Sequence, residues 1–338
     1  MTLIRNIFQV LVVVSLTFVS TPVSRARMGP VDIKPLFLPE IVIFTSQSPA
    51  GVFPEGASPV VIPLKRSGRL FFMEVRIDNQ VGNFIFDTGS SKLVLNKTYF
   101  RKFIVVDEEE AGGVTGSTEG ICRTSVKSLK VADLHFSNLS ADVTALGHIE
   151  DRRGIKILGL LGLSLLKDLE IVVDLNHNEL HLFRLDKKGN RLVTHPQRRF
   201  DLVHKVAEHN NVLFVKAKIG GEQLDFCLDS GAESNVLSSY SSKSVLGTVT
   251  ILKRSGMVGV ASGQTDVLYG MMNDFNLGER RFPAMRTILT NLHKMSKSYG
   301  MVIDGMLGYD FFCQGTISLN LIRNEMGICF SKVNDIPK

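Results

Sequence analysis

The chain has 338 residues, which is enough for two ordinary domains or one large two-lobed domain. Hydrophobic residues make up 44% and charged residues 21%, a globular composition that excludes a disordered chain. The net charge of +6 is spread along the sequence, and no Lys/Arg block interleaves with aromatic residues, so nucleic-acid binding is not expected.

The first 26 residues have the pattern of an export signal. Arg5 precedes an apolar run over residues 7–19, and Ser24-Arg25-Ala26 supplies a small-x-small exit, as in a secretory signal peptide. The run is shorter than the roughly 20 residues that span a bilayer. We therefore expect a periplasmic or secreted protein. An uncleaved anchor is the alternative, and the only one in which we expect a membrane contact. Residues 27–58 contain five prolines and are either a propeptide or an N-terminal arm.

From residue 59 onward the chain contains one pattern twice. Two apolar runs around a Gly/Asn turn, at 70–77 and 83–87, return 142 residues later at 212–219 and 225–229. Such runs predict a strand, a tight turn and a second strand. Only two copies exist, so the protein is not a solenoid. We predict an N-terminal lobe over 59–190 and a C-terminal lobe over 191–338, with residues 187–196 as the link.

A second matched block follows each pair of strands. Leu160-Leu161-Gly162 returns 146 residues later as Met306-Leu307-Gly308. Most runs around these blocks are short, β-branched and punctuated by Gly. The fold class is therefore predicted to be mainly β, with one short helix after Gly162 and another after Gly308.

Each copy places an aspartate at the end of its second apolar run. Asp87 is followed by Thr88-Gly89, and Asp229 by Ser230-Gly231. A carboxylate carried toward a core is costly unless it is hydrogen-bonded, and Gly permits a turn that aims backbone N–H groups at it. If two similar lobes set these turns face to face, the two carboxylates hold a proton between them. One can then act as general base on a water and the other as general acid.

These motifs resemble those of aspartic peptidases of the pepsin and retropepsin type, over residues 59–330. The resemblance implies two barrel-like lobes with a cleft between them, and a monomer that hydrolyses a peptide or protein substrate without metal or cofactor. It implies that Asp87 and Asp229 are catalytic. Supporting positions would be Thr88, Gly89, Ser90, Ser230, Gly231, Gly162 and Gly308. Candidates for the flaps over the cleft are Gly113, Val114, Thr115 and Gly116 in the first copy, and Gly259 and Val260 in the second.

Two further expectations concern single side chains. Ser90 stands where the second copy has Ala232, and the resemblance implies that its hydroxyl donates to the neighbouring carboxylate. Such a bond would make Asp87 the more readily ionised partner. In an exported chain Cys313 and Cys329 could pair, whereas Cys227 is predicted to be a buried thiol.

The sequence also leaves alternatives open. Pepsin-like enzymes carry a Tyr in the first flap, and no Tyr stands between Tyr99 and Tyr240. The compact copies look more like two fused retropepsin units. A catalytically silent peptide-binding protein on the same fold is the main alternative, and two structural turn aspartates are another. A peptidase with one dedicated substrate cannot be separated from a general one. The absence of GxSxG and of a phosphate-loop lysine argues against a serine hydrolase and a nucleotide site.

Overall fold

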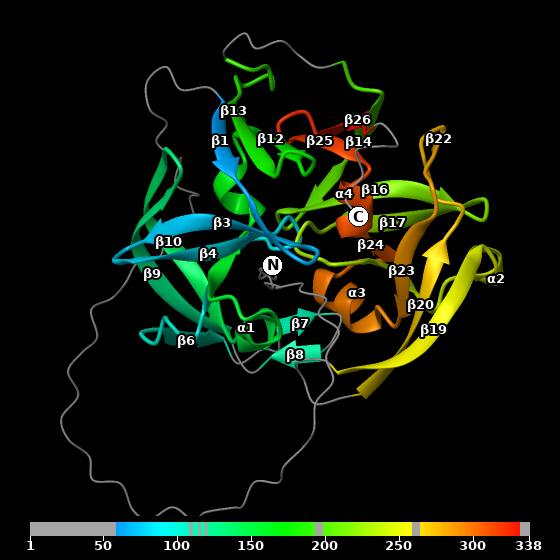
Figure 1. Ribbon diagram of the computed structural model, residues 1–338, viewed down its shortest axis with the longest axis horizontal. Helices are drawn as coiled ribbons and strands as arrows, with labels where there is room; N and C mark the ends of the chain where they lie inside the picture. The colour runs from blue at the N-terminus through cyan, green and yellow to red at the C-terminus, as the bar shows by residue number, and fades with distance from the viewer. Residues whose placement is uncertain are drawn as a thin grey trace, which may run out of the picture.

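The computed structural model describes residues 59–107, 111–113, 116–118, 121–192, 199–258 and 264–331. The expected signal peptide, residues 27–58, and the flap candidates Val114, Thr115, Gly259 and Val260 lie outside these ranges. Three large β-sheets form the described part of the protein (Figure 1). The mainly β, two-lobed fold expected from the sequence is confirmed.

An eight-stranded sheet belongs to the first half of the chain. Its spatial order is β2-β3-β4-β11-β5-β10-β9-β6. The strands are β2 (Lys65–Ser67), β3 (Leu70–Ile77), β4 (Gln80–Phe86), β5 (Leu93–Asn96), β6 (Ile104–Asp107), β9 (Ile121–Val131), β10 (Leu134–Thr144) and β11 (Ile157–Leu161). The expected strand at 70–77 is β3, which alternates buried and exposed residues toward its end and turns at Asp78, where φ is +46°.

A ten-stranded sheet belongs to the second half. Its order is β19-β20-β23-β18-β24-β17-β16-β21-β22, with β15 also paired to β16. The strands are β15 (Ala207–His209), β16 (Val212–Ile219), β17 (Glu222–Leu228), β18 (Asn235–Ser238), β19 (Val249–Val258), β20 (Gln264–Met272), β21 (Asn276–Leu277), β22 (Arg280–Arg281), β23 (Met285–Thr290) and β24 (Gly305–Leu307). The expected strand at 212–219 is β16, and it has the same burial pattern as β3.

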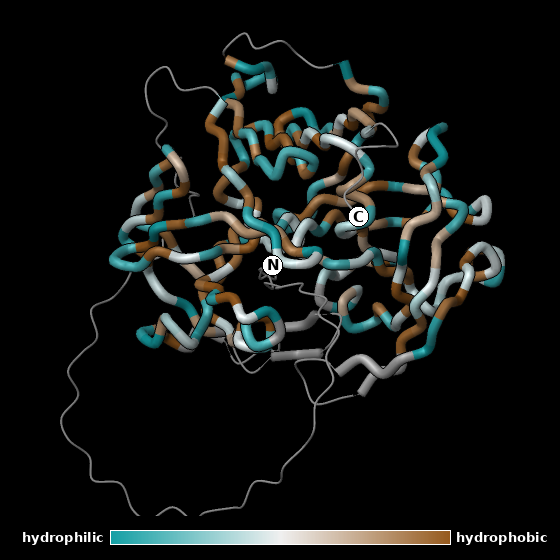
Figure 2. The backbone as a smooth tube through the Cα atoms, in the orientation of Figure 1, coloured by the Kyte–Doolittle hydropathy of each residue, from teal (hydrophilic) through white to brown (hydrophobic). Residues whose placement is uncertain are grey.

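A six-stranded sheet joins the two halves. Its strands are β1 (Val60–Pro63), β12 (Leu169–Asp174), β13 (Glu179–Arg184), β14 (Leu202–Lys205), β25 (Gly315–Asn320) and β26 (Glu325–Phe330). The order β1-β13-β12-β25-β26-β14 puts duplicated strands at the centre, where Ile171 lies opposite Leu319. One hydrophobic core runs through both halves and this sheet, and hydrophobic stretches follow the strands in Figure 2.

The helices are all short. The expected helices after Gly162 and Gly308 are a 3₁₀ helix, η1 (Leu163–Leu166), and α4 (Tyr309–Phe312). Three others were not expected, namely α1 (Gly147–Arg153), α2 (Lys243–Leu246) and α3 (His293–Tyr299). Helices α1 and α3 occupy equivalent places in the two copies, and each ends at a left-handed glycine, Gly154 or Gly300. Within the described ranges no helix has the length and apolar character needed to cross a membrane.

The structure describes part of the expected link over residues 187–196. The first part of the expected link is a tight turn, in which the Asp186 carboxylate accepts hydrogen bonds from the backbone N–H groups of Lys188 and Asn190 at 2.8 Å. Residues 193–196 of that link lie outside the described ranges.

All four cysteines are described, and they are present as thiols, so the suggested pairing of Cys313 with Cys329 is not found. Cys227 is buried, as expected.

Candidate active site

The two aspartates are set at equivalent strand ends by equivalent neighbours. Asp87 follows β4, and its backbone N–H donates to the carbonyl of Leu161 on β11 at 3.1 Å. Asp229 follows β17, and its backbone N–H donates to the carbonyl of Leu307 on β24 at 2.9 Å. Both strand pairs are parallel. The duplicated hydrophobic-hydrophobic-Gly motif is therefore the strand that positions each aspartate.

Gly162 and Gly308 lie directly against the loops that follow the aspartates. A Cβ on Gly162 would be 2.3 Å from the backbone oxygen of Ser90, and one on Gly308 would be 2.7 Å from that of Ala232. Both distances are shorter than real Cβ contacts, so these positions have no room for a side chain. The close contact fixes the height of each loop above its strand.

The two aspartate turns face each other. Gly89 N–H donates to Asp87 Oδ1, and Gly231 N–H donates to Asp229 Oδ1, both at 2.9 Å. A Cβ on Gly89 would lie 2.6 Å from Cγ of Asp229, and one on Gly231 would lie 2.8 Å from Cγ of Asp87. Each glycine is therefore packed against the carboxyl group of the opposite copy. The structure brings together residues that are 142 positions apart in the sequence.

Thr88 and Ser230 tie these turns together through four buried hydrogen bonds. The backbone N–H of Thr88 donates to Ser230 Oγ at 3.0 Å, and that of Ser230 donates to Thr88 Oγ1 at 2.9 Å. The Thr88 hydroxyl in turn donates to the carbonyl of Leu228, and the Ser230 hydroxyl to that of Phe86. Each hydroxyl thereby donates one hydrogen bond and accepts one inside the protein, and the relative position of the aspartates is fixed.

The carboxyl groups are buried and electrostatically linked. Neither Asp87 nor Asp229 has exposed surface. Burial raises the pKa of Asp87 from 3.8 to about 6, although bonds from Asp229 and Gly89 oppose the rise. Burial, and then the charge of Asp87, raise the pKa of Asp229 well above 3.8. Each Oδ2 atom lacks a hydrogen-bond partner among the described residues. The pair is therefore suited to hold one proton and to present two oxygens to a bound molecule.

The expected role of the Ser90 hydroxyl is wrong. Ser90 Oγ donates to the carbonyl of Lys92 at 3.0 Å, which closes the loop after Asp87 instead of reaching a carboxylate. The backbone N–H groups of Ser90 and Ala232 make equivalent bonds, each to its own aspartate carbonyl at 3.2 Å.

The flap candidates belong to two hairpins. In the first copy β7 (Ala111–Gly113) pairs with β8 (Gly116–Thr118), so that Gly113 lies opposite Gly116. In the second copy β19 and β20 form a longer hairpin, and its tip lies outside the described residues. Helix α3 contacts β7, beside which it lies in Figure 1. The flap role itself stays a prediction.

Sequence reasoning missed one tyrosine at the site. Tyr299, at the end of α3, is buried, and its hydroxyl lies 3.5 Å from the carbonyl oxygen of Gly89. Burial raises its pKa, and Cys227, Asp229 and Asp87 add to the rise through their charges. The resemblance places a tyrosine in the first flap, whereas here a tyrosine from the other half of the chain lies next to Gly89. The sequence pattern that could have located this residue is the duplication, because Tyr299-Gly300 follows Arg153-Gly154 by the same 146 residues that separate the two glycine motifs.

Two ion pairs that the sequence did not predict join the two halves of the chain beside the site. Arg153, from α1, forms an ion pair with Glu233, four residues after Asp229, and donates to the carbonyl of Ser67 at 2.5 Å. Arg69 forms an ion pair with Asp310 at 2.7 Å. Both arginines belong to the first half of the chain and both carboxylates to the second.

The described residues contain no group of three or more His, Cys, Asp or Glu side chains that could hold a metal ion.

The comparisons with known proteins agree with this geometry. A family model described as aspartyl protease matches residues 73–165 and 215–311, which contain both aspartate turns and both glycine motifs. The chain belongs to the aspartyl protease family. Its fold is similar to the crystal structure of aspartic proteinase from Irpex lacteus, with a TM-score of 0.51, 12% identity, and coverage of 83% of this chain and 100% of that one. No curated protein sequence matches the chain.

Proposed function

We propose that the protein is an exported aspartic endopeptidase that hydrolyses peptide bonds with Asp87 and Asp229. One observation carries the proposal: two buried carboxyl groups face each other, each with Oδ1 held by a glycine N–H and Oδ2 without a partner among the described residues. Family membership supports a peptide or protein as substrate. Export rests on the first 26 residues, and N-terminal sequencing of exported protein, which should lack them, tests it.

The chemistry uses one proton shared by the pair. The ionised carboxylate removes a proton from a water, whose oxygen attacks the peptide carbonyl carbon, and the protonated carboxyl group donates its proton to the carbonyl oxygen. The tetrahedral intermediate then collapses. The C–N bond breaks, the nitrogen takes a proton from the carboxyl group that had received it, and the intermediate returns a hydroxyl proton to the other carboxylate. The pair thus recovers its single proton.

Replacement of either aspartate tests the dyad. Asp87→Asn and Asp229→Asn should each lower kcat/KM on a peptide library by at least about 10²–10⁴-fold, since each removes a general acid or base. Asp225→Asn is the matched control, because Asp225 is on β17, the strand that leads to Asp229, but pairs with exposed Lys216. Near-normal turnover in either dyad variant, with folding verified by circular dichroism, contradicts the assignment. Peptide binding without cleavage by the wild type would instead identify a silent binding protein.

A further inference from the structure

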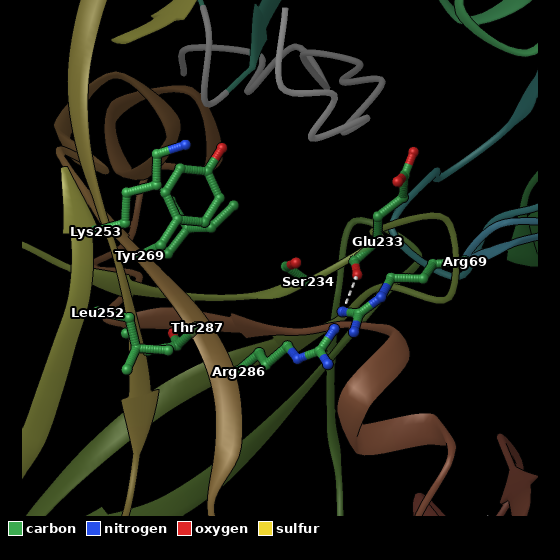
Figure 3. Close-up of a pocket in the computed structure, with 10 residues that line it drawn as sticks. Arg69, Glu233, Ser234, Leu252, Lys253, Tyr269, Arg286 and Thr287 are labelled. Atoms are coloured by element: carbon green, nitrogen blue, oxygen red, sulfur yellow. Dashed lines mark hydrogen bonds between the residues drawn. The ribbon is translucent and has the colours of Figure 1, made fainter. Parts of the chain in front are cut away.

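A pocket of about 480 Å³ lies next to the loop that follows Asp229 (Figure 3). Its walls come from that loop, from strands β19, β20 and β23, and from the turn before β3 in the other half of the chain. Its polar lining includes the side chains of Arg69, Ser234, Lys253, Tyr269, Arg286 and Thr287. We call this the basic pocket. None of these residues was singled out by sequence motifs.

The charges of the basic pocket are predominantly positive. Arg69, Lys253 and Arg286 line it, and Glu233 is the only carboxylate among its lining residues. Arg153 neutralises that carboxylate in an ion pair, whereas Lys253 and Arg286 form no ion pair within the described part of the chain. Figure 3 shows the guanidinium groups of Arg69 and Arg286 pointing toward each other at one side of the pocket. An anion there would meet the charges of Lys253 and Arg286, whereas the charge of Arg69 is already paired with Asp310.

Arg69 is held in place for such a role. Its Nη1 atom donates to Asp310 Oδ2 at 2.7 Å and to the backbone carbonyl of Glu233 at 3.1 Å. A guanidinium has five N–H donors, so other donors remain for a ligand. Because its position is fixed before binding, little side-chain entropy would be lost when a carboxylate is bound.

A buried hydroxyl supplies an independent sign of a ligand. Thr287 is 1% exposed and lines the pocket, and its Oγ1 has no hydrogen-bond partner among the described residues. Leaving a buried hydroxyl unpaired costs free energy, which a bound polar group can offset. Tyr269 and Ser234 are partly buried and bring two further hydroxyls to the same pocket. Guanidinium and hydroxyl donors together suit a carboxylate better than a neutral side chain.

The basic pocket is lined by the loop that follows Asp229, and this limits its distance from the aspartates. Ser234 is five residues after Asp229, so their Cα atoms are at most about 18 Å apart, the length of five extended residues. An extended peptide rises by about 3.3 Å per residue. A peptide whose scissile bond is at the dyad could therefore place a side chain in the pocket within about five residues of that bond.

We propose that the basic pocket binds an Asp or Glu side chain of the peptide substrate, and so selects substrates with an acidic residue at one fixed position within about five residues of the cleaved bond. The inference rests on the proposed peptidase function and adds a substrate class to it. Arg286 and Lys253 would supply the charge, and Thr287 a buried hydrogen bond.

A cleavage profile with matched variants tests the proposal. A peptide library with amidated C-termini, which removes terminal carboxylates as a competing source, should be cleaved by the wild type with a preference for Asp or Glu at one position. Peptides with Glu or Gln there should differ in kcat/KM by about tenfold, as expected for a lost bond to a charged group. Arg286→Gln should lower this ratio severalfold, although Lys253 remains in the pocket. Arg281→Gln, at an exposed residue on β22 at the other edge of the sheet, should leave the ratio unchanged.

A binding arm separates this inference from the proposed catalysis. The Asp229→Asn protein and its double variant with Arg286→Gln are applied to an array of the same peptides. Cleavage without an acidic preference, or a preference that Arg286→Gln does not alter, overturns the inference and leaves the peptidase intact. If the wild type cleaves nothing, an acidic preference on the array that Arg286→Gln weakens supports the pocket although the peptidase proposal fails. If neither cleavage nor an acidic preference occurs, both fail.

Discussion

Thr88 and Ser230 each donate a backbone N–H to the hydroxyl of the other, at 3.0 and 2.9 Å, across the boundary between the two halves of the chain. Both hydroxyl protons are donated to backbone carbonyls, those of Leu228 and Phe86. We therefore expect these two residues to position the aspartates rather than to donate a proton to a substrate.

Removing one of these hydroxyls should damage stability and activity together. Thr88→Val keeps the shape of the side chain but leaves the backbone N–H of Ser230 and the carbonyl of Leu228 without their partner. We expect a loss of about 1–3 kcal/mol in the free energy of unfolding, the cost of unpaired buried groups, and a fall in kcat. Thr88→Ser retains the hydroxyl and should recover most of both. Urea denaturation and initial rates measure the effects, and a Thr88→Val protein as stable as Thr88→Ser would contradict them.

Adding one methyl group at Gly231 should separate the carboxyl groups. The new Cβ would stand 2.8 Å from Cγ of Asp87, so the carboxyl group or the turn must move. Because misplacement of reacting groups by about 1 Å can cost 10²-fold, we expect kcat/KM of Gly231→Ala to fall by at least about that factor. The matched control is Gly147→Ala in α1, where no atom lies within 4 Å of the added Cβ. Equal activity in the two variants would show that the turns are not tightly opposed.

The dyad should destabilise the fold at neutral pH. The pKa values of Asp87 and Asp229 are raised in the folded protein, Asp87 from 3.8 to about 6. The folded state therefore binds more protons than the unfolded state above pH 3.8, and its stability falls as the pH rises through the folded pKa values. Asp229→Asn removes one titrating group. We expect this variant to be more stable than the wild type at pH 7, with the difference shrinking toward pH 4.

Denaturation of both proteins at pH 4, 5, 6 and 7 measures this difference. The same comparison with Asp225→Asn controls for the loss of a carboxylate outside the pair. A difference that stays constant over this pH range, or a variant less stable than the wild type at pH 7, would refute the raised pKa values.

The Tyr299 hydroxyl should contribute to turnover more than to folding. Tyr299→Phe keeps the edge-on ring contact with Phe214, whose centroid is 6.0 Å away, and removes the group next to Gly89. We expect kcat to fall by about 2–10-fold, the range of one neutral hydrogen bond, with KM little changed. Tyr240→Phe, at a residue that is 77% exposed, should change neither constant. Steady-state kinetics decide the point, and an unchanged kcat in Tyr299→Phe would assign the hydroxyl no role.

The sequence predicts the parts of this site that are local and repeated. Strands β3, β4, β16 and β17 follow from alternating apolar residues, and the duplication pairs each aspartate with its glycine motif. Helices α1 and α3 could not be predicted in this way. Each has seven residues and begins after a leucine whose side chain makes no capping hydrogen bond. Helices this short depend on tertiary packing rather than on local preference.

The sequence pattern also could not predict contacts between residues that are far apart in the chain. Tyr299 approaches Gly89 across 210 positions, and Arg69 reaches Asp310 across 241. The Ser90 hypothesis failed for the opposite reason. A shorter-range partner, the carbonyl of Lys92, accepts the hydroxyl that the comparison with Ala232 assigned to a carboxylate.

The six-stranded sheet has a mechanical consequence. Because β12 of the first half and β25 of the second are joined by backbone hydrogen bonds, neither half can slide past the other without breaking this ladder. The two aspartates belong to different halves of the chain, and both halves contribute strands to this sheet. The ion pairs of Arg69 with Asp310 and of Arg153 with Glu233 also connect the halves. In the proposed peptidase, a peptide should therefore be admitted by movement within one half, while the spacing of the two carboxyl groups is conserved.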